Sequence, residues 1–108
     1  LARAGRSVKG VVTFHGTLTT PNPADGKNIK SKVLVLHGAV DPVVPKADRD
    51  ALESELTAAG VDYQIVAFAD TYHSFTNPEA NAAKRSIYDA KVTGRAYAMM
   101  ADFFSELF

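Results

Sequence analysis

The segment over residues 32–45 constrains the fold of this chain more than any other. It contains Val33-Leu-Val-Leu36, a short and continuously apolar run that is typical of a strand covered on both faces of a parallel sheet. The run stops at His37-Gly38, where the glycine favours a turn, and Asp41 follows. The segment therefore predicts a buried strand of an α/β fold with a carboxylate just beyond its carboxyl end.

Strands are expected to alternate with helices along the rest of the chain. Residues 8–14 are rich in β-branched side chains, whereas residues 17–31 contain Pro21, Pro23 and Gly26 and have no helical period. These patterns predict a strand and a long surface loop. By the same criteria the expected elements are the last turn of a helix at 1–5, strands at 8–14, 33–36 and 62–68, and helices at 45–59, 82–88 and 94–108.

Two of these helices show one apolar face each, because apolar residues recur at three- and four-residue spacing. In the helix that Pro45 opens, the expected buried residues are Ala51, Leu52, Leu56 and Ala59. In the C-terminal helix they are Tyr97, Met100, Phe103, Phe104 and Leu107. Both helices are therefore expected to pack on the sheet.

Alternating strands and helices predict a parallel sheet flanked by helices. Only three strands are expected, which would leave an apolar strand edge unpaired and favour self-association through that edge. The sequence also begins with Leu1 rather than Met, and nothing precedes the helical turn expected at residues 1–5. We therefore expect residues 1–108 to form the C-terminal part of one larger α/β domain.

Composition and charge exclude several classes of function. The 108 residues contain 12 Lys and Arg against 12 Asp and Glu, a formal net charge of zero. This balance argues against a nucleic-acid or anionic-membrane partner, since both need a clustered basic surface. The 46% share of hydrophobic residues is enough for a packed core. There is no cysteine, so disulfides, thiolate metal sites and a cysteine nucleophile are excluded within these residues.

No targeting signal is visible in the sequence. The first residues have no apolar segment of a signal peptide, and no apolar run approaches the roughly 20 residues that a membrane helix needs. A cytoplasmic location is therefore the default expectation.

Asp41 and His73 are the strongest candidates for catalysis. His73 follows the strand expected at 62–68, so the two residues belong to consecutive turns of one β-α-β unit. Parallel strands place both turns at the carboxyl edge of the sheet, and neighbouring strands lie only about 4.8 Å apart. The carboxylate could then accept the Nδ1–H of the imidazole and leave Nε2 to act as a base. Taken singly, Asp41 would be a turn or helix-capping residue and His73 a surface loop residue.

A nucleophile for this pair is missing. In hydrolases built on a parallel sheet the chain order is nucleophile, acid, histidine, so a serine should precede Asp41. Ser7 and Ser31 do so, but each comes before a strand, whereas a nucleophile occupies the turn after one. Ser74 adjoins His73 and would point away from it. We therefore expect no nucleophile in this chain.

His15 and His37 each precede a glycine at the end of an expected strand. Together with His73 they could be read as three zinc ligands. No two of the three have the spacing of a metal motif, so no metal ligand is predicted. The favoured interpretation is that both pack near strand ends, with His37 holding the loop before Asp41 by a backbone hydrogen bond.

Taken together, the motifs resemble the dienelactone hydrolase family of the α/β-hydrolase fold. The matching segments cover nearly the whole chain: Gly-Val-Val-Thr-Phe-His15-Gly16, Val-Leu-Val-Leu-His-Gly-Ala-Val-Asp41-Pro-Val-Val-Pro, Tyr-His73-Ser-Phe-Thr-Asn-Pro, Tyr88, and the helix with Phe103-Phe104. The resemblance implies a partial α/β-hydrolase fold in which Asp41 is the triad acid and His73 the triad histidine. It also implies that a cysteine or serine nucleophile and the oxyanion-hole donors lie upstream of Leu1, and that no cofactor is needed.

One position departs from the family pattern. Members that cleave dienelactone carry an arginine four residues after the histidine, which grips the substrate carboxylate, whereas this chain has Asn77 there. The resemblance therefore implies a broader hydrolase of carboxylic esters or lactones, with Asn77 at the substrate-binding position. This chain alone is expected to be inactive. The alternative is a non-catalytic interaction or scaffold module derived from the same fold.

Overall fold

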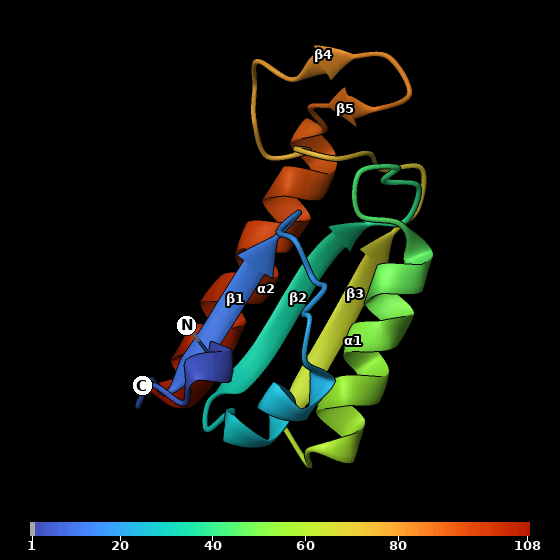
Figure 1. Ribbon diagram of the computed structural model, residues 1–108. Helices are drawn as coiled ribbons and strands as arrows, with labels where there is room; N and C mark the ends of the chain where they lie inside the picture. The colour runs from blue at the N-terminus through green and yellow to red at the C-terminus, as the bar shows by residue number, and fades with distance from the viewer. Residues whose placement is uncertain (1) are drawn as a thin grey trace.

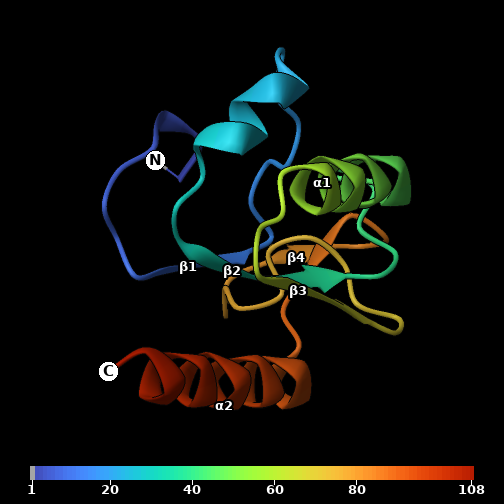
Figure 2. The same cartoon turned by 90° about the horizontal axis from the view of Figure 1, so that it is seen from below.

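A computed structural model describes residues 2–108 and confirms the predicted α/β class (Figure 1). Three parallel strands form one sheet in the order β1-β2-β3, with β1 at Gly10–Phe14, β2 at Lys32–Gly38 and β3 at Tyr63–Phe68. Helix α1 (Lys46–Ala58) covers one face of this sheet and helix α2 (Ala90–Leu107) covers the other, so the fold has three layers (Figure 2).

Strand β2 lies at the centre of the sheet because its side chains are apolar on both faces. Its residues alternate between two hydrophobic cores, as the period of a strand requires. Val33 and Val35 pack toward α1, and Leu34 and Leu36 pack toward α2. The core on the α1 side is completed by Leu18, Val44, Leu52 and Leu56, and the core on the α2 side by Phe68, Phe75, Val92 and Ala96.

The predicted elements at the start of the chain correspond closely to the observed ones. The helical turn expected at residues 1–5 is a short 3₁₀ helix, η1 (Ala2–Ala4), followed by Gly5 at a φ of 74°; Leu1 lies outside the described residues. The surface loop expected at 17–31 contains a second 3₁₀ helix, η2 (Pro23–Asn28), which Asn22 caps by accepting a hydrogen bond from Ala24 N at 3.2 Å. Asn22 thus supplies the local cap that the sequence analysis did not identify.

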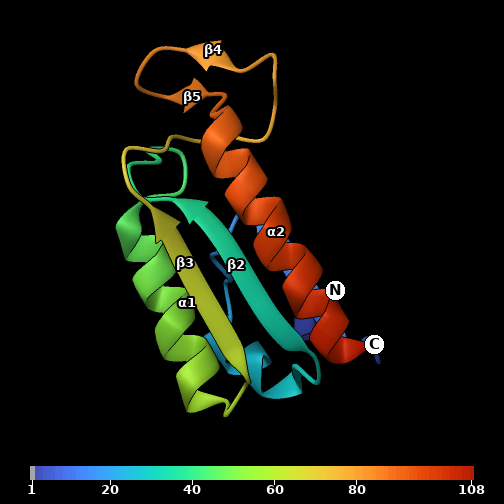
Figure 3. The same cartoon turned by 180° about the vertical axis from the view of Figure 1, so that it is seen from behind.

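The prediction of a helix at residues 82–88 is wrong. This segment is a small antiparallel hairpin, β4 (Asn81–Ala82) and β5 (Ser86–Ile87), which lies above the carboxyl edge of the sheet (Figure 3). It is held by pairing with the backbone of His73, which donates from its N–H to Arg85 O at 3.1 Å and accepts from Ile87 N at 3.2 Å. Tertiary pairing therefore overrides the helical propensity of this segment.

The two long helices differ from the expectation in their details. Helix α2 begins at Ala90 rather than at residue 94, because Asp89 caps it through a 2.9 Å hydrogen bond from Val92 N. Its buried face is correspondingly shifted, and Tyr97 is 47% exposed although its ring packs against Phe14 at 5.4 Å. Helix α1 buries Leu52 and Leu56 as predicted, but Ala51 is exposed and Glu55 is buried in the same face. Neither helix, nor any other within residues 2–108, has the length and apolarity needed to cross a bilayer.

Candidate active site

The turn after β2 and the loop after β3 are tied together at the carboxyl edge of the sheet. Ala39 N donates to Phe68 O at 2.8 Å, and Val40 N donates to Thr71 O at 3.2 Å. The approach is so close that a Cβ atom on Gly38 would lie 2.3 Å from Thr71 O. Only glycine permits this contact, which explains why the last residue of β2 is a glycine.

The carboxylate of Asp41 is buried and fully occupied by hydrogen bonds. Oδ1 accepts from Val43 N at 2.8 Å and from Val44 N at 2.9 Å, an arrangement typical of an aspartate that closes its own turn. Oδ2 accepts from the Nδ1 atom of His73 at 2.8 Å, and the side chain of Asp41 has no exposed surface. The turn therefore fixes the direction in which the carboxylate faces the histidine.

His73 meets Asp41 as the sequence predicted. Its backbone is paired with the β4–β5 hairpin, and the next residue but one, Phe75, anchors the loop in the core with no exposed surface. Because a carboxylate only accepts hydrogen bonds, Nδ1 carries the proton in the neutral ring and Nε2 presents a lone pair. No group within residues 2–108 hydrogen-bonds Nε2, and 22% of the side chain is exposed. The pair can thus accept a proton at Nε2 and stabilise the resulting imidazolium.

His37 lies behind Asp41 and is completely buried. Its Nε2 atom hydrogen-bonds Val44 O at 3.2 Å and lies 3.2 Å from Oδ2 of Asp41, while Nδ1 has no partner among the described residues. The predicted backbone hydrogen bond is confirmed, although it holds the loop after Asp41 rather than the loop before it. Burial lowers the pKa of His37, with Asp41 opposing this effect and Arg49 adding to it. A neutral His37 therefore donates through Nε2, because Val44 O can only accept.

His15 directly follows β1 and lies beside His73. The two rings are edge to face with their centroids 5.5 Å apart, and Nε2 of His15 forms a 2.8 Å hydrogen bond with Oγ1 of Thr76. Burial, followed by the nearby His73 and His37, lowers the pKa of His15. Within residues 2–108 no group of three or more His, Cys, Asp or Glu side chains is arranged to hold a metal ion.

Backbone strain is concentrated around this pair. Among residues 2–108, four non-glycine residues have a positive φ, and three of them are at the carboxyl edge of the sheet: His15 at 24°, Asp70 at 53° and Ser74 at 57°. Each such residue costs on the order of 1–3 kcal/mol, and strain of this kind clusters at functional sites.

The remaining candidate residues lie away from the pair or on its border. Ser7 and Ser31 precede β1 and β2 and therefore lie at the opposite, amino edge of the sheet. Ser74 directly follows His73, and its carbonyl accepts a hydrogen bond from Asn77 N at 2.9 Å. Asn77 is exposed, and its Oδ1 accepts from Glu79 N at 3.0 Å, which leaves the amide nitrogen for other partners.

A second polar cluster was missed by the sequence analysis. Arg3 donates to both carboxylate oxygens of Glu55, at 2.8 Å from Nε and 2.6 Å from Nη2, and Nη2 also donates to Leu18 O at 2.8 Å. This pairing with Glu55 raises the pKa of Arg3. The sequence signal was present, since a glutamate between Leu52 and Leu56 interrupts an apolar helix face.

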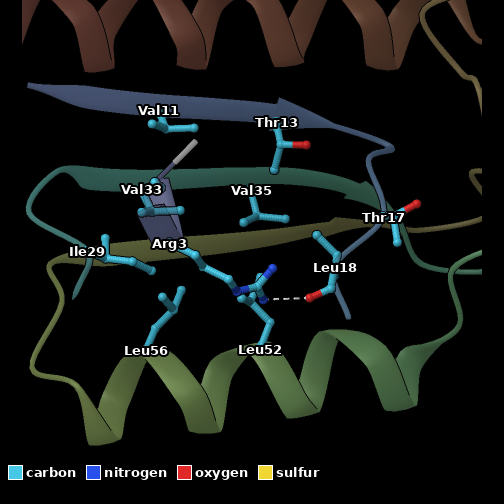
Figure 4. Close-up of a pocket in the computed structure, with 11 residues that line it drawn as sticks. Arg3, Val11, Thr13, Thr17, Leu18, Ile29, Val33, Val35, Leu52 and Leu56 are labelled. Atoms are coloured by element: carbon cyan, nitrogen blue, oxygen red, sulfur yellow. Dashed lines mark hydrogen bonds between the residues drawn. The ribbon is translucent and has the colours of Figure 1, made fainter. Parts of the chain in front are cut away.

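Arg3 also borders an apolar cavity of about 240 Å³ between the sheet and α1 (Figure 4). Its other lining residues are Ala2, Val11, Thr13, Thr17, Leu18, Ile29, Val33, Val35, Leu52 and Leu56. Neither Asp41 nor His73 belongs to this lining, so the cavity is separate from the acid–histidine pair.

Known proteins are similar to this chain in sequence and in fold. An uncharacterised protein of Caenorhabditis elegans is 33% identical over 107 residues, with 94% of this chain and 66% of that protein covered. Dipeptidyl aminopeptidase BIII of Pseudoxanthomonas mexicana is 32% identical over 79 residues, which cover 69% of this chain and 12% of that enzyme. The crystal structure of a dienelactone hydrolase-like promiscuous phosphotriesterase from metagenomic libraries is 38% identical with a TM-score of 0.92, covering 99% of this chain and 46% of that one.

The solved structure shares the overall fold of this chain. The chain spans 66% of the nematode relative and less than half of the solved structure. Residues 1–108, the whole sequence, match the model of the dienelactone hydrolase family. The chain therefore belongs to the dienelactone hydrolase family, whose members have the α/β-hydrolase fold.

Proposed function

We propose that this chain supplies the acid and the histidine of a nucleophile–His–Asp triad in a hydrolase of carboxylic esters or lactones. The observation that carries the proposal is the 2.8 Å hydrogen bond between Asp41 Oδ2 and His73 Nδ1 at the carboxyl edge of a parallel sheet. It is supported by the two backbone hydrogen bonds that orient the carboxylate, and by the membership of the chain in the dienelactone hydrolase family.

In this proposal His73 transfers protons in both halves of the reaction. Nε2 takes the proton of the nucleophile, which attacks the carbonyl carbon, and the tetrahedral intermediate collapses when the same proton passes to the leaving oxygen. The acyl-enzyme is then cleaved by a water molecule whose proton is taken by Nε2; this proton passes to the nucleophile as the carboxylic acid is released. Asp41 holds the ring and stabilises the imidazolium at each stage without being protonated itself.

We further propose that residues 1–108 form the C-terminal part of one α/β-hydrolase domain. A preceding part would carry the cysteine or serine nucleophile and the oxyanion-hole donors. The support is the coverage of the similar solved structure, of which this chain spans only 46%. The outer edge of β1 also has no partner strand within residues 2–108, which is consistent with a further strand beside it.

The substrate is expected to be a carboxylic ester or lactone, with little preference for a carboxylated lactone over a neutral ester. Asn77 offers only a neutral amide at the position where the resemblance implies a carboxylate-gripping arginine. A second candidate reaction is phosphotriester cleavage, because a protein with this activity in its name is 38% identical to the chain with a TM-score of 0.92. The same nucleophile, deprotonated by the same base, would attack phosphorus instead of a carbonyl carbon.

The proposal is tested by ester hydrolysis with the whole protein, using p-nitrophenyl esters and an aryl phosphotriester in parallel. We expect His73→Ala to lower kcat by about 10³-fold or more, and Asp41→Asn to cause a loss of similar size. Asp50→Asn is the matched control, since Asp50 is exposed on α1 and its ion-pair partner within the described part of the chain is Lys46. Turnover that survives His73→Ala would contradict the triad, and an intact protein that cleaves neither substrate class would favour the scaffold alternative.

The 108-residue chain produced alone should hydrolyse no ester, because the acid–histidine pair lacks a nucleophile and oxyanion-hole donors. It should also self-associate through the open edge of β1. Ester hydrolysis that His73→Ala abolishes would show that the chain contains a nucleophile, and a monomer in size-exclusion chromatography would contradict the association.

A further inference from the structure

His15 contacts three residues of the loop that carries His73. Its ring is edge to face with His73 and with Phe75, with centroids 5.5 Å away in both cases, and its Nε2 atom bonds Oγ1 of Thr76 at 2.8 Å. His15 directly follows β1, whereas Thr76 is 61 residues further along the chain. One side chain thus joins the first strand to the catalytic loop.

The backbone of His15 has a strained conformation. Its φ of 24° lies in the left-handed region, which a β-carbon disfavours, and a hydrogen bond from its N–H to Leu36 O at 3.3 Å holds it there. Strain of this kind persists only where the surroundings enforce it, and it is more often found at functional sites. The ring of His15 is therefore held in place from its own backbone as well as from Thr76.

The charge state of His15 suits a neighbour of a proton-transferring histidine. Burial lowers its pKa, and so do His73 and His37, while Asp41 acts in the opposite direction. A neutral His15 does not repel the imidazolium that forms on His73 during the reaction. It also keeps one ring nitrogen available for the hydrogen bond with Thr76.

We infer that His15 is a positioning residue that holds the residue 73–76 loop, so that the ring of His73 stays aligned with Asp41. This inference rests on the proposed role of His73 in catalysis. It assigns to the His15–Thr76 hydrogen bond a function separate from that of the Asp41–His73 bond. The loop is also anchored by the pairing of the His73 backbone with the β4–β5 hairpin, and on the far side by Phe75 O, which accepts from Thr93 Oγ1 at 2.8 Å and from Asp89 N at 3.0 Å. His15 therefore supplies the anchor on the β1 side.

The experiment removes the two partners of the bond separately and together in the whole protein. His15→Phe keeps an aromatic ring against His73 but loses the hydrogen bond, and Thr76→Val loses the hydroxyl without a change of size. Thr76→Ser keeps the hydroxyl and is the conservative variant. Thr57→Val is the matched control, since it deletes a 2.6 Å hydroxyl–hydroxyl bond with Tyr63 that lies outside the site.

We expect His15→Phe and Thr76→Val each to lower kcat for ester hydrolysis by about three- to tenfold, the factor that one neutral hydrogen bond represents. KM should stay within about twofold, the double variant should be no slower than the slower single variant, and Thr76→Ser and Thr57→Val should resemble the wild type. Losses that multiply in the double variant would overturn the inference. So would a raised KM in His15→Phe alone, because that result would assign His15 to substrate contact.

A spectroscopic measurement separates this inference from the proposed function. In ¹⁵N-labelled protein, the Nδ1–H proton of His73 should give a downfield signal that is protected from exchange by the bond to Asp41. We expect the signal in the wild type and in Thr57→Val, and its broadening in His15→Phe and Thr76→Val. An unchanged signal in both site variants would contradict positioning by His15, whether or not the protein hydrolyses esters.

Discussion

The buried ion pair between Arg3 and Glu55 offers a sharp test of the packing between the start of the chain and α1. The Glu55 side chain is 3% exposed and the Arg3 side chain 26%, and two hydrogen bonds join them. Removing one member of a buried pair leaves an uncompensated charge and costs about 3–5 kcal/mol, whereas an exposed pair contributes at most about 1 kcal/mol. Because Arg3 is partly exposed, we expect Arg3→Met to lower the free energy of unfolding by about 3 kcal/mol.

The two single variants should differ because the two partners differ in burial. Arg3→Met strands a buried carboxylate and removes the donor of Leu18 O, whereas Glu55→Gln leaves a guanidinium that water can reach. The expected loss for Glu55→Gln is therefore smaller, about 1 kcal/mol. In the double variant Arg3→Met, Glu55→Leu, no charge is buried, so about 2 kcal/mol of the Arg3→Met loss should be recovered.

The assay is guanidinium chloride unfolding of the whole protein, followed by circular dichroism. Lys46→Met is the matched control, since Lys46 and Asp50 form a 2.8 Å pair on α1 with both side chains more than half exposed. That substitution should change stability by less than about 0.5 kcal/mol. If Arg3→Met costs no more than Lys46→Met, or if the double variant is less stable than Arg3→Met, the reasoning from burial is refuted.

Three further predictions follow from the site. Burial lowers the pKa of His15 and of His37, so below about pH 6.5 the unfolded chain binds protons that the folded chain does not. The free energy of unfolding should therefore fall from pH 7 to 5.5, by at most about 2.7 kcal/mol per pH unit for the two histidines together. An equally steep fall in the His37→Gln variant would contradict this prediction. Gly38→Ala should lower the free energy of unfolding and kcat, because its Cβ would lie 2.3 Å from Thr71 O. Gly94→Ala is the control: the space around Gly94 is open, so this change should be neutral or stabilising in the same unfolding assay. Asn77→Arg should raise the preference for a carboxylated lactone over a neutral ester, mainly through KM; an unchanged ratio of kcat/KM values would refute the role of position 77.

The parts of the site that the sequence predicted depend on local pattern and on topology. The apolar run of β2 requires burial on both faces, and the carboxyl ends of parallel strands must meet at one edge. Those two constraints are enough to predict from the sequence that Asp41 and His73 lie together. The same constraints placed Ser7 and Ser31 at the opposite edge.

The parts that were missed depend on contacts between distant segments. The β4–β5 hairpin has strands of only two residues and a turn with Lys84 at a φ of 57°, so neither alternation nor a glycine marks it in the sequence. It forms because its backbone pairs with His73. The contact of His15 with Thr76 likewise arises only when the loop folds back onto β1, and a histidine before a glycine gives no sign of that partner.

Hydrogen bonds within the described residues hold the acid–histidine pair. Asp41 is oriented by Val43 N and Val44 N of its own turn, and the backbone of His73 by the β4–β5 hairpin. A group that is already aligned loses little conformational entropy when the reaction begins. A nucleophile from another part of the protein would therefore need to approach only the Nε2 side of a ring that is already in place. On this reasoning the alignment of the base should be independent of how the nucleophile is presented.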